Sequence, residues 1–144
     1  MTSWDDVRGR LEDELRTLDD ASFVVVAEPE PPRPPARGLL HRRPAAAPVR
    51  YVQVRRDGEH CYAECVGATS FGGDWDVDDA THARLRELGW RVPGDEDPSG
   101  VEPSYPHYWK LLPRIEADRV ASLCADSLAL LGADASTLQW RRES

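Results

Sequence analysis

The chain has 144 residues, of which 31% are charged, with a net charge of −8 and a pI near 5.0. This length fits a single domain over residues 1–144, and the acidic balance excludes a duplex nucleic-acid binder, because phosphate contacts need a basic face. No apolar run reaches the 18 residues of a membrane span and no signal-peptide pattern opens the chain, so we expect a cytoplasmic protein without a membrane partner.

The first element expected is a helix that begins after Ser3 and ends near Asp20. Ser3 is a favourable N-cap, and apolar residues follow at the spacing of three and four that is typical of an amphipathic helix. These residues are Trp4, Val7, Leu11, Leu15 and Leu18. The next run, Phe23 to Ala27, is short, apolar and β-branched, which predicts a strand covered on both faces.

A proline- and arginine-rich loop is expected over residues 29–48. Its prolines exclude the interior of a sheet. The stretch from Pro32 to Arg37 matches P-x-x-P-x-R, a docking ligand for aromatic grooves in other settings. We favour a stiff surface loop over that docking role.

The stretch from Val49 to Val66 predicts a β-hairpin, around which the rest of the fold is organised. Two β-favouring runs flank Asp57-Gly58, a dipeptide typical of two-residue type I′ turns. With Arg56 opposite Glu59, one face pairs Val54 with Cys61, Val52 with Ala63 and Arg50 with Cys65, and the other pairs Arg55 with His60, Gln53 with Tyr62, Tyr51 with Glu64 and Val49 with Val66.

The two faces of this hairpin differ in character, because side chains alternate along a strand. The face with Val52 and Val54 is small and apolar, and we expect helices to cover it. The face with Tyr51 and Gln53 is polar and aromatic. It is expected to meet water, a partner subunit or a bound peptide, and the sequence leaves these three open.

A second helix is expected after Asp78 or Asp79, which can cap it, and Gly89 is placed to end it. Its apolar positions are Val77, Thr81, Leu85 and Leu88. Trp90 to Val92 predicts a short strand, and Tyr105 to Leu112 predicts an aromatic strand or an extended segment.

A last helix is expected from Pro113 to Leu131, with Gly132 ending it, and Thr137 to Trp140 could add an edge strand. The order is therefore helix, three strands, helix, one or two strands, helix. It predicts an α+β fold, an antiparallel sheet with helices packed on one face.

No catalytic residue, cofactor or metal site is expected. The alternate acids Asp74, Asp76 and Asp78 are spaced as in a calcium loop, but Asp79 and Leu85 stand where that loop needs glycine and glutamate. No pair of histidines has metal-ligand spacing, and no phosphate or nucleophile motif is present. The three cysteines, Cys61, Cys65 and Cys124, are expected to be reduced core thiols.

Several stretches from Tyr51 onward resemble one family. They are Tyr51-Val-Gln-Val, the Ala63-Glu64 strand, the helix that ends in Leu88-Gly89-Trp90-Arg-Val-Pro93, and Tyr108-Trp109 followed after Pro113 by a long helix. Over residues 51–140 the chain resembles the TY-Chap proteins, small actinobacterial domains grouped with YbjN and with type III secretion chaperones. The resemblance implies a fold like theirs, a peptide-binding role and no catalytic residue.

The first functional hypothesis is a cytoplasmic chaperone that holds an extended client segment, with a homodimer as a further expectation. The residues expected at the client surface are Tyr51, Gln53, Tyr62, Trp90 and Trp109. The alternative is an immunity or antagonist protein whose acidic segment, residues 57–104 with a net charge of −9, meets one folded basic enzyme. Neither hypothesis needs a cofactor, and an enzymatic role is not expected.

Overall fold

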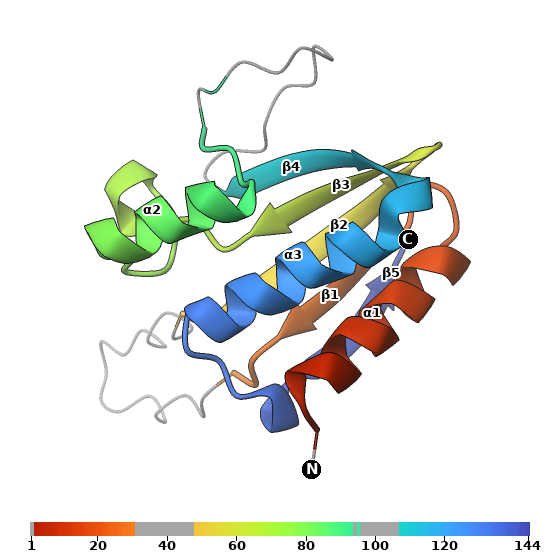
Figure 1. Cartoon of the computed structure of the whole chain (residues 1–144), viewed down its shortest axis with the longest axis horizontal. Coiled ribbons are helices and arrows are strands. Elements are labelled where there is room, and N and C mark those ends of the chain that lie inside the picture. The colour runs from red at the N-terminus through yellow and green to blue at the C-terminus, as the bar shows by residue number, and fades with distance from the viewer. Residues whose placement is uncertain (1, 31–47, 94, 96–106) are drawn as a thin grey trace, which may run out of the picture.

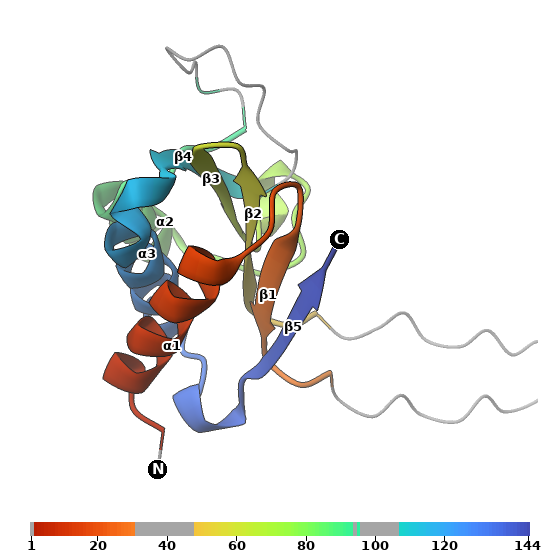
Figure 2. The ribbon, with the colours of Figure 1, turned by 90° about the vertical axis from the view of Figure 1, so that its right-hand side faces the viewer.

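The computed structural model describes residues 2–30, 48–93, 95 and 107–144. They form one five-stranded antiparallel sheet in the order β4-β3-β2-β1-β5, with the α-helices on one of its faces (Figure 1). Turned by 90°, the molecule shows a layer of helices beside the sheet, and no α-helix of the described residues lies on the sheet's other side (Figure 2). The predicted α+β fold is confirmed. The predicted docking segment from Pro32 to Arg37 lies outside the described residues.

The first helix, α1, spans Trp4–Thr17 and ends three residues before the predicted end near Asp20. Ser3 and Asp6 form a capping box, in which each side chain accepts from the other residue's backbone N–H. The buried stripe of α1 is Val7, Leu11 and Leu15. It packs beside α3, Ala117–Leu130, and an ion pair between Arg8 and Asp126 joins the two helices.

Strand β1, Phe23–Ala27, lies between β2 and β5. Val24 and Val26 face the helices, but Val25 points to the other side of the sheet. There it is bordered by Gln53 of β2 and Arg141 of β5, its cross-strand neighbours. Val25 is nevertheless buried, with 4% exposed, so the prediction that β1 is covered on both faces holds, although no α-helix of the described residues lies on this second face.

The hairpin of β2, Tyr51–Asp57, and β3, His60–Cys65, is present, but its predicted register is wrong by two residues. The observed pairs include Val52 with Cys65, Val54 with Ala63, and Gln53 with Glu64. A shift of two keeps every side chain on its predicted face, because the alternation has a period of two. The buried face therefore carries Val52 and Val54, as predicted.

The turn itself explains the shift. Its two central residues are Gly58 and Glu59, and Gly58 has a φ of 61° while Glu59 does not have a positive φ. Glycine in the first central position suits a turn that needs positive φ only there, whereas a type I′ turn centred here would force Glu59 into it as well. The backbone N–H of Gly58 donates to Asp20 Oδ1 at 2.8 Å, so a residue before β1 fixes the turn.

The second helix, α2, spans Asp79–Leu88; Asp78 caps it by accepting from the Thr81 N–H at 2.7 Å, and Gly89 ends it. The predicted strand Trp90–Val92 is reduced to a single bridge between Arg91 and Trp109. Strand β4 spans Tyr108–Pro113, and short 3₁₀ helices span Thr69–Phe71, Arg114–Glu116 and Ala135–Thr137.

The last helix begins later than predicted. The chain passes from Pro113, which ends β4, through the 3₁₀ turn Arg114–Glu116 before α3 starts at Ala117. Gly132, with a φ of 91°, follows the end of α3. The edge strand β5 spans Gln139–Glu143, further along the chain than the predicted Thr137 to Trp140.

The core lies between the helices and one face of the sheet. It contains Val52, Val54 and Ala63 from the sheet and Leu11 and Leu128 from the helices. The three cysteines are free and buried, as predicted. All of these groups lie on the helix side, which leaves the other face of the sheet to carry a different set of residues.

Candidate functional site

The face of the sheet opposite the helix layer (Figure 2) is called the open face below. By strand register it receives side chains from all five strands, from alternate residues of each strand. These residues are Phe23, Val25, Ala27, Tyr51, Gln53, Arg55, Asp57, His60, Tyr62, Glu64, Trp109, Leu111, Pro113, Gln139, Arg141 and Glu143. The set mixes apolar, aromatic and charged side chains.

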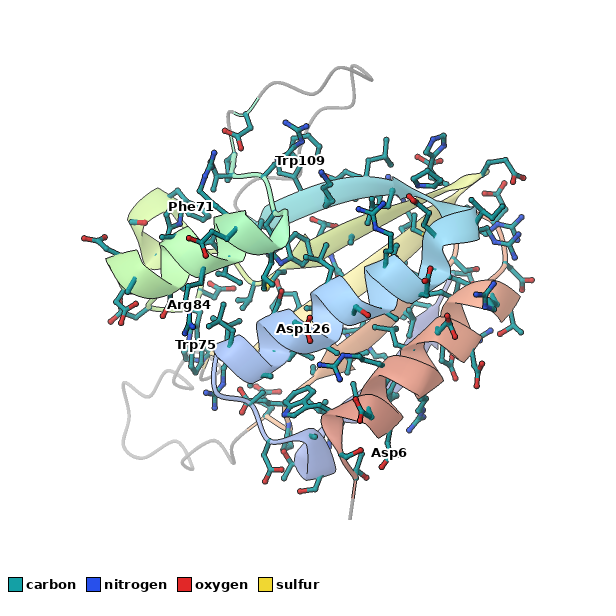
Figure 3. The ribbon with its side chains drawn as sticks, viewed as in Figure 1. Asp6, Phe71, Trp75, Arg84, Trp109 and Asp126 are labelled. Atoms are coloured by element: carbon teal, nitrogen blue, oxygen red, sulfur yellow. The ribbon has the colours of Figure 1, made fainter. Side chains whose placement is uncertain are left out.

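Two stacked aromatic rings belong to the open face. Tyr62 of β3 and Trp109 of β4 are both buried and stack with ring centroids 6.2 Å apart at an interplanar angle of 15°. The indole N–H of Trp109 donates to the backbone carbonyl of Val92 at 3.1 Å, which fixes the ring. Figure 3 shows Trp109 on β4, well away from Asp126 on α3.

An arginine lies over the outer side of each ring. The guanidinium carbon of Arg55 is 5.4 Å from the Tyr62 ring centroid, and that of Arg91 is 5.8 Å from the Trp109 ring. Both distances are within the range of a cation–π contact. The rings and guanidiniums therefore make a row across β2, β3, β4 and the bridge residue Arg91.

Glu64 lies in the middle of the open face. Its cross-strand neighbours are Gln53 on β2 and Trp109 on β4, and only 7% of the residue is exposed. The Gln53 amide donates to Glu64 Oε1 at 3.0 Å. The other carboxylate oxygen, Oε2, is buried and has no hydrogen-bond partner within the part of the chain that the structure describes.

Beside Glu64, the open face is hollowed at the end where β2 begins. Two adjoining hollows of about 690 Å³ and 350 Å³ share Val25, Ala27, Val49, Tyr51 and Arg141 in their walls. Together they are called the groove below. Its walls include Val25 and Ala27 of β1 together with the charged Glu28, Asp74 and Arg141.

Tyr51 is the polar group best placed inside the groove. Its hydroxyl lies 3.1 Å from Nε2 of His107. Burial, and then the negative charges of Asp74 and Glu64, raise the pKa of Tyr51 to about 12. The phenol therefore stays protonated near neutral pH and keeps a proton to donate.

Four of the five residues predicted for the client surface lie together on the open face: Tyr51, Gln53, Tyr62 and Trp109. Trp90 does not. It is 2% exposed and its indole N–H donates to the Ser127 hydroxyl at 2.6 Å, in the core beneath α3. The reason is that Gly89 turns the chain back at the end of α2, where the Trp90 N–H donates to the Leu85 carbonyl.

Sequence reasoning did not single out Val25, Glu64, His107 or Leu111 as site residues. A signal for Glu64 did exist, since an acid between Ala63 and Cys65 interrupts an otherwise apolar strand. The position of His107 beside Tyr51 could not be predicted from the sequence, because it depends on how β4 pairs with β3.

The described residues hold no group of three or more His, Cys, Asp or Glu side chains placed to bind a metal ion. Asp78, from the acidic run, serves instead as the cap of α2. No helix among residues 2–30, 48–93 and 107–144 is long and apolar enough to cross a membrane. The chemistry that the open face offers is apolar contact, ring stacking and hydrogen bonding.

Comparison with known protein families gives a match over most of the chain. Residues 1–136 match a family model described as TY-Chap3, T3SS (YopN, CesT) and YbjN peptide-binding chaperone 3. The match includes the α-helices and strands β1 to β4, and it ends before β5. No curated protein and no solved structure matches the chain.

Proposed function

The chain belongs to the TY-Chap3 family of peptide-binding chaperones, and from this premise we propose that its open face binds an extended segment of a client protein. The family is one of chaperones and is non-catalytic, so the chain is not an enzyme. What the proposal adds to the family assignment is the place of binding and the manner in which the client is held.

The observation that carries the proposal is that α-helices cover only one of the two faces of the sheet among the described residues. The helices cover the face of Val52 and Val54, whereas no α-helix of the described residues covers the face of Val25 and Leu111 (Figure 2). A sheet face that is polar throughout would simply meet water. This one carries apolar side chains and a groove beside the buried rings, which is the usual character of a binding surface.

An extended client strand fits this surface chemically. Its side chains alternate, so every second one can enter the groove against Val25 and Ala27, while the others point outward. The hydroxyl of Tyr51 and the amide of Gln53 can hydrogen-bond to client backbone groups that lose water on binding. Much of the affinity would come from the apolar contacts.

The sheet edges are less suited to hold the client. Strand β5 ends the sheet and carries Arg141, Arg142 and Glu143 in succession, and charged residues on an edge discourage the addition of another strand. At the opposite edge, Trp109 of β4 already pairs with Arg91. These features support binding across the open face in preference to binding along an edge.

A pair of leucine truncations tests the proposal. Leu111 lies on the open face, and Leu88 is a partly exposed leucine at the end of α2 on the helix side. An array of extended decapeptides of varied composition identifies binders, and the affinity of the best one is then measured in solution. We expect Leu111→Ala to weaken that affinity about tenfold, as the loss of roughly 1.4 kcal/mol of apolar contact requires.

Leu88→Ala is the matched control and should leave the affinity unchanged. Equal effects of the two truncations would contradict binding at the open face. An array that retains no peptide would contradict the proposed function as a whole.

The homodimer and the cytoplasmic location are part of the same proposal. Three free, buried cysteines support a reducing compartment, where disulfides are rare. Native mass measurement of the purified chain tests the dimer, and fractionation of the host cell tests the location. A strict monomer at micromolar concentration would remove the dimer from the proposal without affecting the open face.

A further inference from the structure

We propose that Glu64 makes the open face select client segments that carry a lysine or arginine side chain. This inference rests on the proposed function, because it needs the open face to be the client site. It adds the chemical class of the client residue that is recognised and the protein group that recognises it.

The hydrogen bonds of the described residues satisfy the Glu64 carboxylate only in part. One oxygen accepts from Gln53, and the other is buried without a hydrogen-bond partner among the described residues. An ionised carboxylate that is buried and only partly hydrogen-bonded is costly, unless a cation pairs with it. Such a group in a native structure calls for a specific explanation.

A second largely buried glutamate of this protein is fully paired. Glu28, whose side chain is also largely buried, accepts from the Nε, the Nη2 and the backbone N–H of Arg50. No ion pair reaches Glu64 in the part of the chain that the structure describes. Its unpaired oxygen is thus a local feature of the open face and not a general looseness of the fold.

Two arginines at or beside the open face, Arg55 and Arg91, do not pair with Glu64. Arg55 stands over the Tyr62 ring, with Asp57 3.8 Å from its guanidinium, and Arg91 stands over the Trp109 ring. Each is held at the outer end of the row, and the two rings lie between them. Neither forms an ion pair with Glu64, so the carboxylate is left for a cation from outside the described chain.

A lysine or arginine side chain of a client could reach Glu64 from the groove. The buried rings of Tyr62 and Trp109 adjoin Glu64, and each already has the other ring on one face and an arginine on the other, so an incoming cation would meet the carboxylate and not the rings. Gln53 lines the groove and is half-buried, so a change of its rotamer would open a path to Oε2. Side-chain rotamer changes of this kind are common when a partner binds.

The test compares four fluorescein-labelled decapeptides of alternating valine and serine that differ only at one central residue. That residue is lysine, norleucine, glutamine or glutamate. Binding to the full chain is followed by fluorescence anisotropy at about 0.5 M salt, where long-range attraction by the net charge of −8 is screened. We expect the lysine peptide to bind at least tenfold more tightly than each of the other three.

Two isosteric variants with the same change in net charge separate Glu64 from the overall acidity of the protein. Glu64→Gln should abolish the preference, so that the lysine and norleucine peptides bind equally tightly. Glu87→Gln, at an exposed position on α2, should leave the preference intact. The comparison of lysine with norleucine on the unmodified protein needs no variant, so the inference stays testable even if Glu64→Gln does not fold.

The failures of the two proposals are distinguishable. If the protein binds all four peptides equally, or binds the glutamine peptide as tightly as the lysine peptide, the inference about Glu64 is overturned and the open face remains the client site. Equal loss of the preference in both variants overturns it as well. If none of the four peptides binds, both the inference and the proposed function fail.

Discussion

Arg50 holds Glu28 through three hydrogen bonds, two from its guanidinium at 2.5 and 2.7 Å and one from its backbone N–H at 3.0 Å. The same guanidinium donates to the carbonyl of Leu131 at the end of α3 and lies 4.7 Å from the ring centroid of Trp75. One side chain thus ties β1, β2, α3 and the loop before α2 together beside the groove.

This pair gives the fold an acid-sensitive component. The hydrogen bonds from Arg50 lower the pKa of Glu28 below its ordinary value of 4.5. Because the folded-state pKa is the lower one, the stabilisation is fully present above about pH 4.5 and is lost as the pH falls through the folded-state pKa. The free energy of unfolding should therefore drop below pH 4.5.

Glu28→Gln should lower the free energy of unfolding by about 1.5–3 kcal/mol at pH 7, because it removes hydrogen bonds to a charged group. Its stability should also fall less steeply than that of the unmodified protein between pH 5 and pH 2. Urea unfolding over this pH range measures both effects. Glu12→Gln, at a surface ion pair with Arg16, is the control and should change stability by less than about 0.5 kcal/mol.

The bond from Trp90 to Ser127 predicts a mutation that affects stability without affecting binding. Ser127→Ala leaves the buried indole N–H of Trp90 without an acceptor, which should cost about 1–3 kcal/mol. Peptide affinity should stay unchanged, since both residues lie on the helix side. Ser122→Ala, elsewhere on α3, is the matched control with an expected change within about 0.5 kcal/mol. A loss of peptide affinity in Ser127→Ala would contradict binding at the open face.

Two glycines predict opposite effects of the same substitution. Gly9 lies inside α1 with open space around it, so Gly9→Ala should raise the free energy of unfolding by about 0.5–1 kcal/mol. Gly132 has a φ of 91°, and a Cβ there would lie 2.9 Å from Nη1 of Arg50. Gly132→Ala should therefore lower stability by about 1–3 kcal/mol. Urea midpoints that move in the same direction would contradict this assignment.

The cysteines should be unreactive in the folded protein. Burial raises the pKa of Cys65 to about 12 and also raises the pKa of Cys61 and Cys124. The thiolate is the reactive form, so both its scarcity and its burial suppress attack. A colorimetric thiol reagent at pH 8 should label none of the three within minutes, and all three in denaturant. Rapid labelling of the native protein would show that the core opens readily.

The sequence allowed the two faces of the hairpin to be predicted but not its register. Alternation decides whether Val52 and Gln53 point to opposite sides, and this result survives a shift of two residues. The shift itself depends on Asp20, whose carboxylate accepts from the Gly58 N–H across 38 positions of sequence. A contact of this range leaves no trace in the local pattern around Asp57-Gly58.

The candidate site could be predicted in part for the same reason. Tyr51, Gln53 and Tyr62 followed from strand alternation alone. Trp90 was misplaced because its burial depends on the turn at Gly89 and on an acceptor, Ser127, that lies 37 positions away on α3. The central place of Glu64 between Gln53 and Trp109 required the pairing of three strands at once, which no single stretch of sequence encodes.

The most direct test of the central claim is a methyl NMR titration of the chain with the tightest-binding decapeptide. If the client lies on the open face, the methyl resonances of Val25 and Leu111 shift, while those of Val52, Val54 and Leu128 in the helix-covered core stay in place. Shifts confined to the helix side, or to Leu88 at the end of α2, would contradict binding at the open face.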